Sequence, residues 1–280
     1  MAGIRTNTAI ATAAILLSIF ALVVFLTPWQ DSETDPPLAQ APGVSTSAVA
    51  APEPTARACR DNPQASVDIP ASAQLVLDAM DLETKVNQMF VVAFHGTSVD
   101  TDVEIERTFN EIVIGTATLG DLLGDGGIGG ILLFGRNTPD VRGAVDLTTE
   151  VQAEAAQAET PGVFVVVDHE GGQVTRIKEG IINYPGAPTL GSIGDPLLIR
   201  DVAAATASQL RSAGINVILA PVADVARPNQ EGPLDDRTFG TKPTDVASAV
   251  AATIDGFATE RVAAVVKHFP GLGSTTVDSH

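Results

Sequence analysis

The chain has 280 residues, 45% of them hydrophobic, and its mean hydropathy is +0.22, which allows a sizeable core and excludes a wholly disordered chain. Asp and Glu outnumber Lys and Arg by 34 to 16, which gives a formal net charge of −18 and a sequence pI near 4.4. Such a chain repels phosphate backbones and anionic lipid surfaces, so nucleic-acid binding is excluded as a leading function.

The N-terminal segment, residues 1–28, contains an uncharged apolar run from Ala9 to Leu26 that is preceded by Arg5. As a helix this run would extend about 27 Å, which is borderline between a membrane span and a long signal-peptide core. No small-residue cleavage site and no lipid-accepting cysteine follow the run closely. We therefore expect an exported protein that is anchored in the membrane through residues 9–26, with a cleaved signal peptide and secretion as the alternative.

Residues 29–72 are dominated by Pro, Ala, Ser, Thr and acidic side chains, with few large apolar ones. This composition predicts a disordered tether, and residues 73–280 are expected to form the folded domain. The only cysteine, Cys59, lies in the tether. An intramolecular disulfide is therefore impossible even in an exported chain.

The folded part begins with apolar residues at helical spacing in residues 73–89, where Asp81 is expected to cap a second helical segment. Two longer segments, 141–158 and 198–214, are also amphipathic with the helical period. Between the helices lie five short apolar runs of the kind that forms strands buried on both faces of a parallel sheet. These runs are residues 90–94, 130–134, 163–167, 217–220 and 262–266.

Strands that alternate with helices predict a parallel α/β fold, either a (β/α)8 TIM-type barrel or an open doubly wound sheet. Polar or charged residues follow nearly every run, and chemistry spread over many strand ends is a property of the barrel. No G-x-G-x-x-G motif follows the first run, as a dinucleotide-binding open sheet would require. We therefore predict a barrel, of which about the first five strand–helix units are present.

Four segments at the predicted strand ends resemble the N-terminal domain of glycoside hydrolase family 3, and more narrowly its β-N-acetylglucosaminidase (β-N-acetylhexosaminidase) branch. They are VDHEGGQVTRI (167–177), INVILAPVADV (215–225), DDRTFG (235–240) and KHFPGLGSTTVDSH (267–280). The resemblance implies a retaining glycosidase that removes terminal β-linked N-acetylglucosamine from cell-wall-type glycans. It implies neither a cofactor nor a metal ion.

The resemblance also implies roles for particular side chains. Asp168 would accept hydrogen bonds from sugar hydroxyls, and Arg176, Arg237, Lys267 and His268 would bind the sugar as cations and donors. The alternative for each is structural. Asp168 would cap the next helix, Arg237 would pair with a neighbouring aspartate, and His268 would be a buried core histidine.

Asp278 and His280 are the predicted acid/base pair, because this branch uses a histidine on the loop after strand five, assisted by an aspartate two residues earlier. An imidazole titrates near neutrality, and a neighbouring carboxylate can support its cationic form. The nucleophilic aspartate of the family belongs to strand seven, beyond residue 280, so we expect a fragment that is inactive alone. Leu272 stands where the family usually has histidine, which leaves the polarity of the loop open.

Three other functions stay open from the sequence. A complete five-stranded chain would be a non-catalytic, glycan-binding pseudoenzyme, and another family 3 β-glycosidase would share most of the motifs. A metal-dependent barrel hydrolase could use His95, His169, Glu170, His268 and His280, although no closely spaced ligand pair such as H-x-H is present.

Overall fold

The computed structural model describes residues 70–227, 234 and 236–272. The predicted anchor, nearly all of the predicted tether, Asp278 and His280 lie outside the described residues. Within the described part of the chain, no helix is both long enough and apolar enough to cross a membrane.

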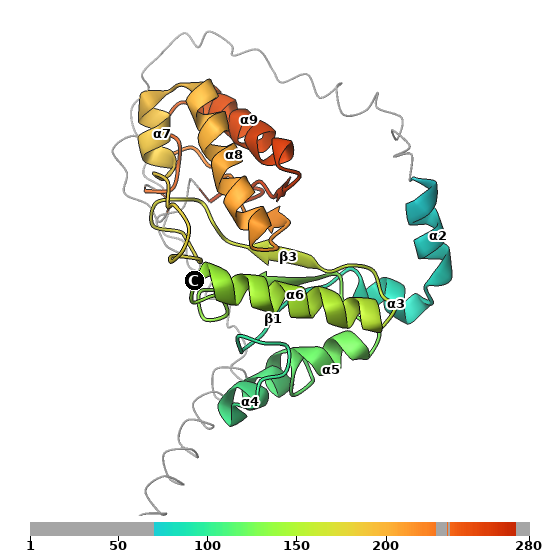
Figure 1. Cartoon of the computed structure of the whole chain (residues 1–280). Coiled ribbons are helices and arrows are strands. Elements are labelled where there is room, and N and C mark those ends of the chain that lie inside the picture. The colour runs from blue at the N-terminus through green and yellow to red at the C-terminus, as the bar shows by residue number, and fades with distance from the viewer. Residues whose placement is uncertain (1–69, 228–233, 235, 273–280) are drawn as a thin grey trace, which may run out of the picture. The chain divides into compact units, whose positions relative to one another are not determined.

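Five parallel strands form one sheet in the order β1-β2-β3-β4-β5 (Figure 1). They are Val91–Ala93, Gly130–Leu133, Phe164–Val167, Val217–Ile218 and Ala263–Ala264. Each strand lies within one of the five predicted runs. A sequential parallel order is that of the first strands of a (β/α)8 barrel, whereas the order of a doubly wound sheet reverses at a switch point. The predicted α/β class and partial barrel are therefore confirmed.

Helices connect the successive strands, as expected for parallel crossovers. α4 (Glu104–Val113) and α5 (Leu119–Gly124) follow β1, α6 (Val141–Gln157) follows β2, α7 (Ala187–Ile193) and α8 (Pro196–Ser212) follow β3, and α9 (Pro243–Thr259) follows β4. The sequence predicts α6 and α8 to within a few residues of their bounds. It does not predict α4, α5, α7 or α9.

Side-chain caps set the first residues of several helices. The Asp81 carboxylate accepts a hydrogen bond from the backbone N–H of Thr84 at 2.8 Å, so it separates α2 (Ala71–Ala79) from α3 (Leu82–Asn87) as predicted. Asp140 caps α6 in the same way by accepting from the N–H of Gly143 at 2.7 Å. Local sequence therefore determines where these helices begin.

The two faces of the sheet differ in burial because the helices cover one of them. The buried face packs into the main hydrophobic core together with side chains of α6 and α8. Its fully buried residues are Ile131, Leu133, Val165, Val167 and Ile218. On the opposite face, Val91 and Phe164 share one lateral row through the strand register and remain 51% and 56% exposed, whereas Val166 and Val217 in the next row are buried. The apolar helix-facing side therefore holds the sheet together and fixes its carboxyl edge.

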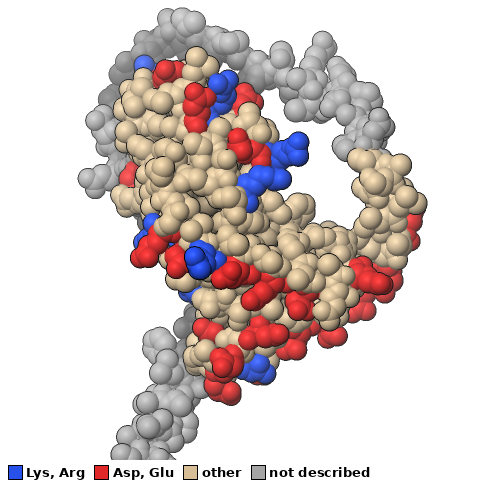
Figure 2. Space-filling view, in the orientation of Figure 1, with Lys and Arg blue, Asp and Glu red and all other residues tan. Residues whose placement is uncertain are grey.

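Acidic side chains gather over α4, α5 and α6 on the face of the molecule shown in Figure 2. Asp146 and Glu150 of α6, for example, are exposed. Few Lys or Arg side chains are visible among them. This surface lies on helices rather than at the strand ends, and it carries part of the excess negative charge of the chain.

Candidate active site

Charged side chains converge at the carboxyl edge of the sheet, where three neighbouring strands end. The side chains are Asp168, Glu170 and Arg176 after β3, Asp224 and Arg237 after β4, and Lys267 and His268 after β5. The pairing of β4 with β5 continues beyond the strands through a bridge between Val222 and Lys267. The parallel sheet thereby brings together groups that lie up to a hundred residues apart in the sequence.

Asp168 lies between two cations at the solvent-reachable part of this cluster. Its Oδ2 accepts a hydrogen bond from Arg176 Nη2 at 2.7 Å, and its Oδ1 lies 2.5 Å from Lys267 Nζ. Burial opposes ionisation, but Lys267 and Arg176 outweigh it and hold the pKa of Asp168 below its usual range. The next helix has Gly186 as its N-cap, so the helix-capping alternative for Asp168 is wrong.

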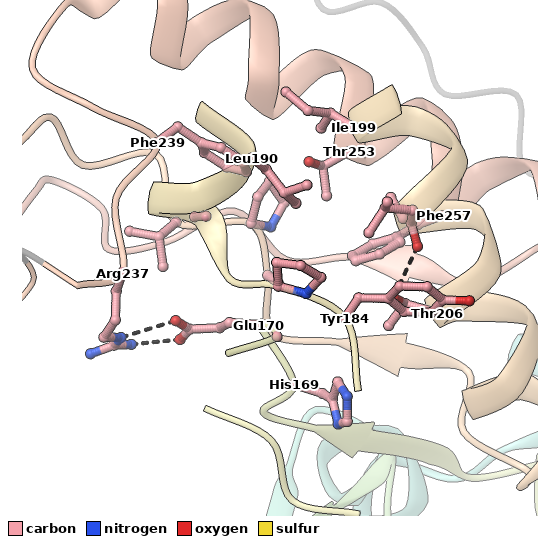
Figure 3. Close-up of a pocket in the computed structure, with 18 residues that line it drawn as sticks. His169, Glu170, Tyr184, Leu190, Ile199, Thr206, Arg237, Phe239, Thr253 and Phe257 are labelled. Atoms are coloured by element: carbon pink, nitrogen blue, oxygen red, sulfur yellow. Dashed lines mark hydrogen bonds and ion pairs between the residues drawn. The ribbon is translucent and has the colours of Figure 1, made fainter. Parts of the chain in front are cut away.

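Glu170 holds two of the predicted sugar-binding cations, although the sequence does not predict this role. Its carboxylate accepts from Arg237 Nε at 2.9 Å and Nη2 at 2.6 Å (Figure 3), and its Oε1 lies 2.5 Å from Lys267 Nζ. The hydrogen bond from Arg237 to Glu170 raises the pKa of Arg237 further, so the guanidinium stays charged. Two-point pairing of this kind fixes the plane of an arginine side chain.

Asp224 holds the segment that follows β5. Its Oδ2 accepts from the backbone N–H of His268 at 3.1 Å and lies 2.7 Å from His268 Nδ1, while its Oδ1 accepts from the N–H of Leu272 at 2.5 Å. On the other side of the ring, His268 Nε2 lies 3.4 Å from Arg237 Nη2. His268 therefore stands between a carboxylate and a guanidinium.

His169 and His95 do not join the charged cluster. His169 is 2% exposed, points away from Glu170 and Arg237 (Figure 3), and burial lowers its pKa to about 4. His95 stacks on Phe109 with the ring centroids 4.9 Å apart. Among residues 70–227, 234 and 236–272, no group of three or more His, Cys, Asp or Glu side chains is arranged to hold a metal ion.

A mainly apolar cavity of about 40 Å³ lies beside Glu170 and Arg237 and extends under α7, α8 and α9 (Figure 3). Leu190, Ile199 and Phe257 contribute to its lining. A volume of this size accommodates only a few water molecules and no sugar ring. A ligand of the charged cluster must therefore approach Asp168 from the solvent side.

Sequence comparison assigns this chain to a family. The profile of the Glycosyl hydrolase family 3 N terminal domain matches residues 81–280. The chain belongs to glycoside hydrolase family 3. The Beta-hexosaminidase A of Pseudoalteromonas piscicida is 34% identical over 168 residues, which cover 58% of this chain and 28% of that protein. The Beta-hexosaminidase of Nitrosospira multiformis is 36% identical over 159 residues, which cover 55% of this chain and 44% of that protein.

Solved family 3 structures share the fold of this chain over the matched residues. A β-N-acetylglucosaminidase from Paenibacillus sp. str. FPU-7 superposes with a TM-score of 0.60 and 32% identity, covering 72% of this chain and 35% of that one. NagZ from Neisseria gonorrhoeae, solved with N-trifluoroacetyl-D-glucosamine, gives a TM-score of 0.57 and 29% identity, covering 68% and 52%. The family resemblance of the four strand-end segments is thus confirmed. The chain spans less than half the length of both curated family 3 relatives.

The geometry brings together the five predicted sugar-binding residues of this family 3 chain, namely Asp168, Arg176, Arg237, Lys267 and His268. The predicted acid/base pair, Asp278 and His280, lies outside the described residues. Sequence reasoning did not predict the part that two carboxylates play in the cluster: it gave Glu170 only as a possible metal ligand, and it gave Asp224 no role. Both are carboxylates in the loops that follow apolar strands, three residues after β3 and six residues after β4, and this position was the available signal.

Proposed function

We propose that the protein, in its full natural length, is a retaining β-N-acetylhexosaminidase that releases terminal β-linked N-acetylglucosamine from glycans. The observation that carries the proposal is the Asp168 carboxylate, kept ionised between Arg176 and Lys267 at the solvent-reachable end of the strands. The names of the family 3 relatives, which are β-hexosaminidases and β-N-acetylglucosaminidases, support the same substrate class.

The cluster has the hydrogen-bonding groups that a sugar ring requires. Each oxygen of Asp168 has a remaining lone pair and can accept a hydrogen bond from a ring hydroxyl, whereas Arg176 and Lys267 can donate to hydroxyl or acetamido oxygens. The side chains of Arg176, Asp168 and Lys267 are 32%, 19% and 14% exposed, so they can contact a ligand without first losing their mutual ion pairs. A carboxylate flanked by donors therefore orients the sugar that is cleaved.

The proposed chemistry requires two further groups. His280, assisted by Asp278, would protonate the leaving oxygen and then deprotonate the attacking water. An aspartate from a later strand of the full-length protein would form the glycosyl-enzyme bond, as retention of configuration requires. The residues described above would hold the sugar between these two groups.

The proposed substrate is a cell-wall glycan, and the proposed location is outside the cytoplasm. The apolar run of residues 9–26 and the Pro-, Ala- and Ser-rich segment of residues 29–72 support both proposals. A tether of this composition would let a membrane-anchored domain reach a polymer layer above the lipid.

The test compares the full-length protein with its His280→Ala variant on aryl N-acetyl-β-glucosaminides. Loss of a general acid typically lowers the rate by about 10²- to 10⁴-fold, and the loss should be greatest for aryl groups that leave poorly. The exposed Asp201→Asn variant is the control and should keep full activity. Full activity without His280 would refute its assigned role, and faster hydrolysis of aryl β-glucosides would refute the substrate.

A further inference from the structure

We propose that Asp224 is a positioning residue that fixes the tautomer of His268 and the course of residues 268–272. Its effect on catalysis rests on the proposed function, whereas its effect on the histidine ring does not. Asp224 cannot itself touch a sugar, because its side chain is only 2% exposed. It acts through the groups that it holds.

The tautomer follows from the chemistry of the partners. A carboxylate only accepts hydrogen bonds, so the 2.7 Å contact between Asp224 Oδ2 and His268 Nδ1 requires the proton on Nδ1. In the neutral ring, Nε2 then carries a lone pair. That lone pair faces Arg237 Nη2, a donor, at 3.4 Å. Asp224 thereby determines that His268 presents an acceptor rather than a donor to the arginine.

The arrangement continues from His268 to the sugar-binding cations. Arg237 is fixed on its other side by the two-point contact with Glu170, and Glu170 also holds Lys267. From Asp224 through His268, Arg237 and Glu170 to Lys267, donors and acceptors form a row in which they alternate in one direction only. Reversal of the His268 tautomer would place a ring N–H against the Arg237 N–H and weaken the row at its centre.

Asp224 also fixes the backbone on which His268 lies. The N–H of Ala223 donates to the carbonyl of Lys267 at 2.8 Å, and the N–H of Lys267 donates to the carbonyl of Pro221 at 3.2 Å. The carboxylate extends this attachment by accepting from the backbone N–H groups of His268 and Leu272. The segment that it holds leads on in the sequence to the proposed acid/base residues.

Asp224→Asn is the decisive substitution because it keeps the size of the side chain and removes one acceptor. In either orientation of the amide, its NH₂ group faces an N–H that the carboxylate accepts from, either that of Leu272 or those of His268. If the NH₂ group faces His268, Nδ1 must become the acceptor and the proton moves to Nε2. The variant therefore weakens the backbone attachment or reverses the tautomer.

The first measurement is ¹⁵N NMR of the imidazole rings in the full-length protein, with His268→Gln used to assign the His268 signals. We expect the Nδ1–H form in the wild type at pH 7.5 and a mixture or the Nε2–H form in Asp224→Asn. An Nε2–H ring in the wild type would overturn the proposal. So would an unchanged ring together with unchanged backbone signals for residues 268–272 in the variant.

The second measurement is kcat/KM on an aryl N-acetyl-β-glucosaminide. Small misplacement of binding groups costs about a hundredfold, which is the loss expected for Asp224→Asn. Asp140→Asn is the matched control, since Asp140 also accepts a backbone hydrogen bond but caps α6; it should lose less than twofold. Unchanged kcat/KM in Asp224→Asn would overturn the positioning role. A wild type that is inactive would instead refute the proposed function, and the NMR test of the tautomer would still apply.

Discussion

The ends of β1 and β2 and the ends of β3, β4 and β5 all carry polar residues, but these residues bind different partners. After β2, the fully buried Asn137 donates to the carbonyls of Phe94 and Gly96 at 3.2 and 2.8 Å and accepts from the N–H of Phe134 at 2.9 Å. Arg136 donates to the Phe94 carbonyl and lies 4.5 Å from the centre of the Phe134 ring. After β3 to β5, the charged side chains bind mainly one another, and Asp224 in addition accepts from the backbone N–H groups of His268 and Leu272.

This difference separates structural positions from candidate functional ones. A side chain that satisfies backbone groups cannot leave them without a cost in stability, because a buried carbonyl without a donor is unfavourable. Side chains that pair with each other at an exposed edge can exchange part of that pairing for a ligand. A polar residue after a buried strand is therefore an ambiguous signal until its partners are known.

The largest effect is expected at the β3 end, from Asp168→Asn in the full-length protein. Loss of two charged hydrogen bonds to sugar hydroxyls, at about 2 kcal/mol each, corresponds to about a thousandfold lower kcat/KM. The free energy of unfolding should change by only about 1 kcal/mol, as is usual for single substitutions. Steady-state kinetics and urea denaturation measure the two effects. A fall in stability with unchanged kinetics would place Asp168 among the structural residues. The β3 end would then not differ from the β2 end.

The opposite pattern is expected at the β2 end, from Asn137→Ala. Three backbone groups lose their hydrogen bond to Asn137 inside the core, although the Phe94 carbonyl keeps the bond from Arg136, so the free energy of unfolding should fall by about 3 kcal/mol. At a temperature where the variant is folded, kcat/KM should stay within threefold of the wild type. A thousandfold kinetic loss in a folded variant would show that both sets of strand ends serve the site.

The smallest expected effect is on the pH dependence of stability and concerns His169. This residue lies between Asp168 and Glu170 in the sequence but is buried like a structural residue. Its pKa is about 4 in the fold against an ordinary value of 6.5. The neutral ring therefore stabilises the fold fully above about pH 6.5, and this contribution is lost as the pH falls toward 4. Between pH 7 and pH 5 the loss should be about 2 kcal/mol.

Denaturation of the wild type and of His169→Gln at both pH values isolates this contribution, because glutamine does not titrate. The variant should lose about 2 kcal/mol less than the wild type over the same interval. Equal losses in the two proteins would show that the ring of His169 can be protonated without cost in the fold. His169 would then be accessible to the charged cluster.

The sequence predicts the strands better than the helices, for a physical reason. Strands of a parallel sheet stand out as continuous apolar runs, and each of the five runs contains a strand, although Val91 and Phe164 are exposed rather than buried. α9 was missed because it packs through small residues rather than through a stripe of large ones. A Cβ added to its Gly256 would clash with the carbonyl oxygen of Arg200 in α8, so close helix contact is what requires glycine there. Helical spacing of large apolar residues does not reveal such contacts.

The same limit applies to the site. The predicted cations could be found because they stand in recognisable segments, whereas the function of their buried partners depends on contacts across the sheet. Glu170 meets Arg237 across 67 residues, and Asp224 meets His268 across 44 residues. Sequence reasoning places each carboxylate at a strand end, but only the register of β3, β4 and β5 determines which cation it meets.

The charged cluster is electrically balanced, which bears on how binding responds to salt. Beside His268 it contains three carboxyl groups and three basic groups, namely Asp168, Glu170, Asp224, Arg176, Arg237 and Lys267. Opposite charges this close produce little field at a distance, so ionic strength should scarcely affect the capture of an uncharged ligand. The capture of sulfated or phosphorylated glycans should depend on ionic strength. The remainder of a chain with net charge −18 repels them before they reach the strand ends. A chain with this net charge therefore disfavours the approach of anionic ligands by long-range repulsion, without any contact at the site.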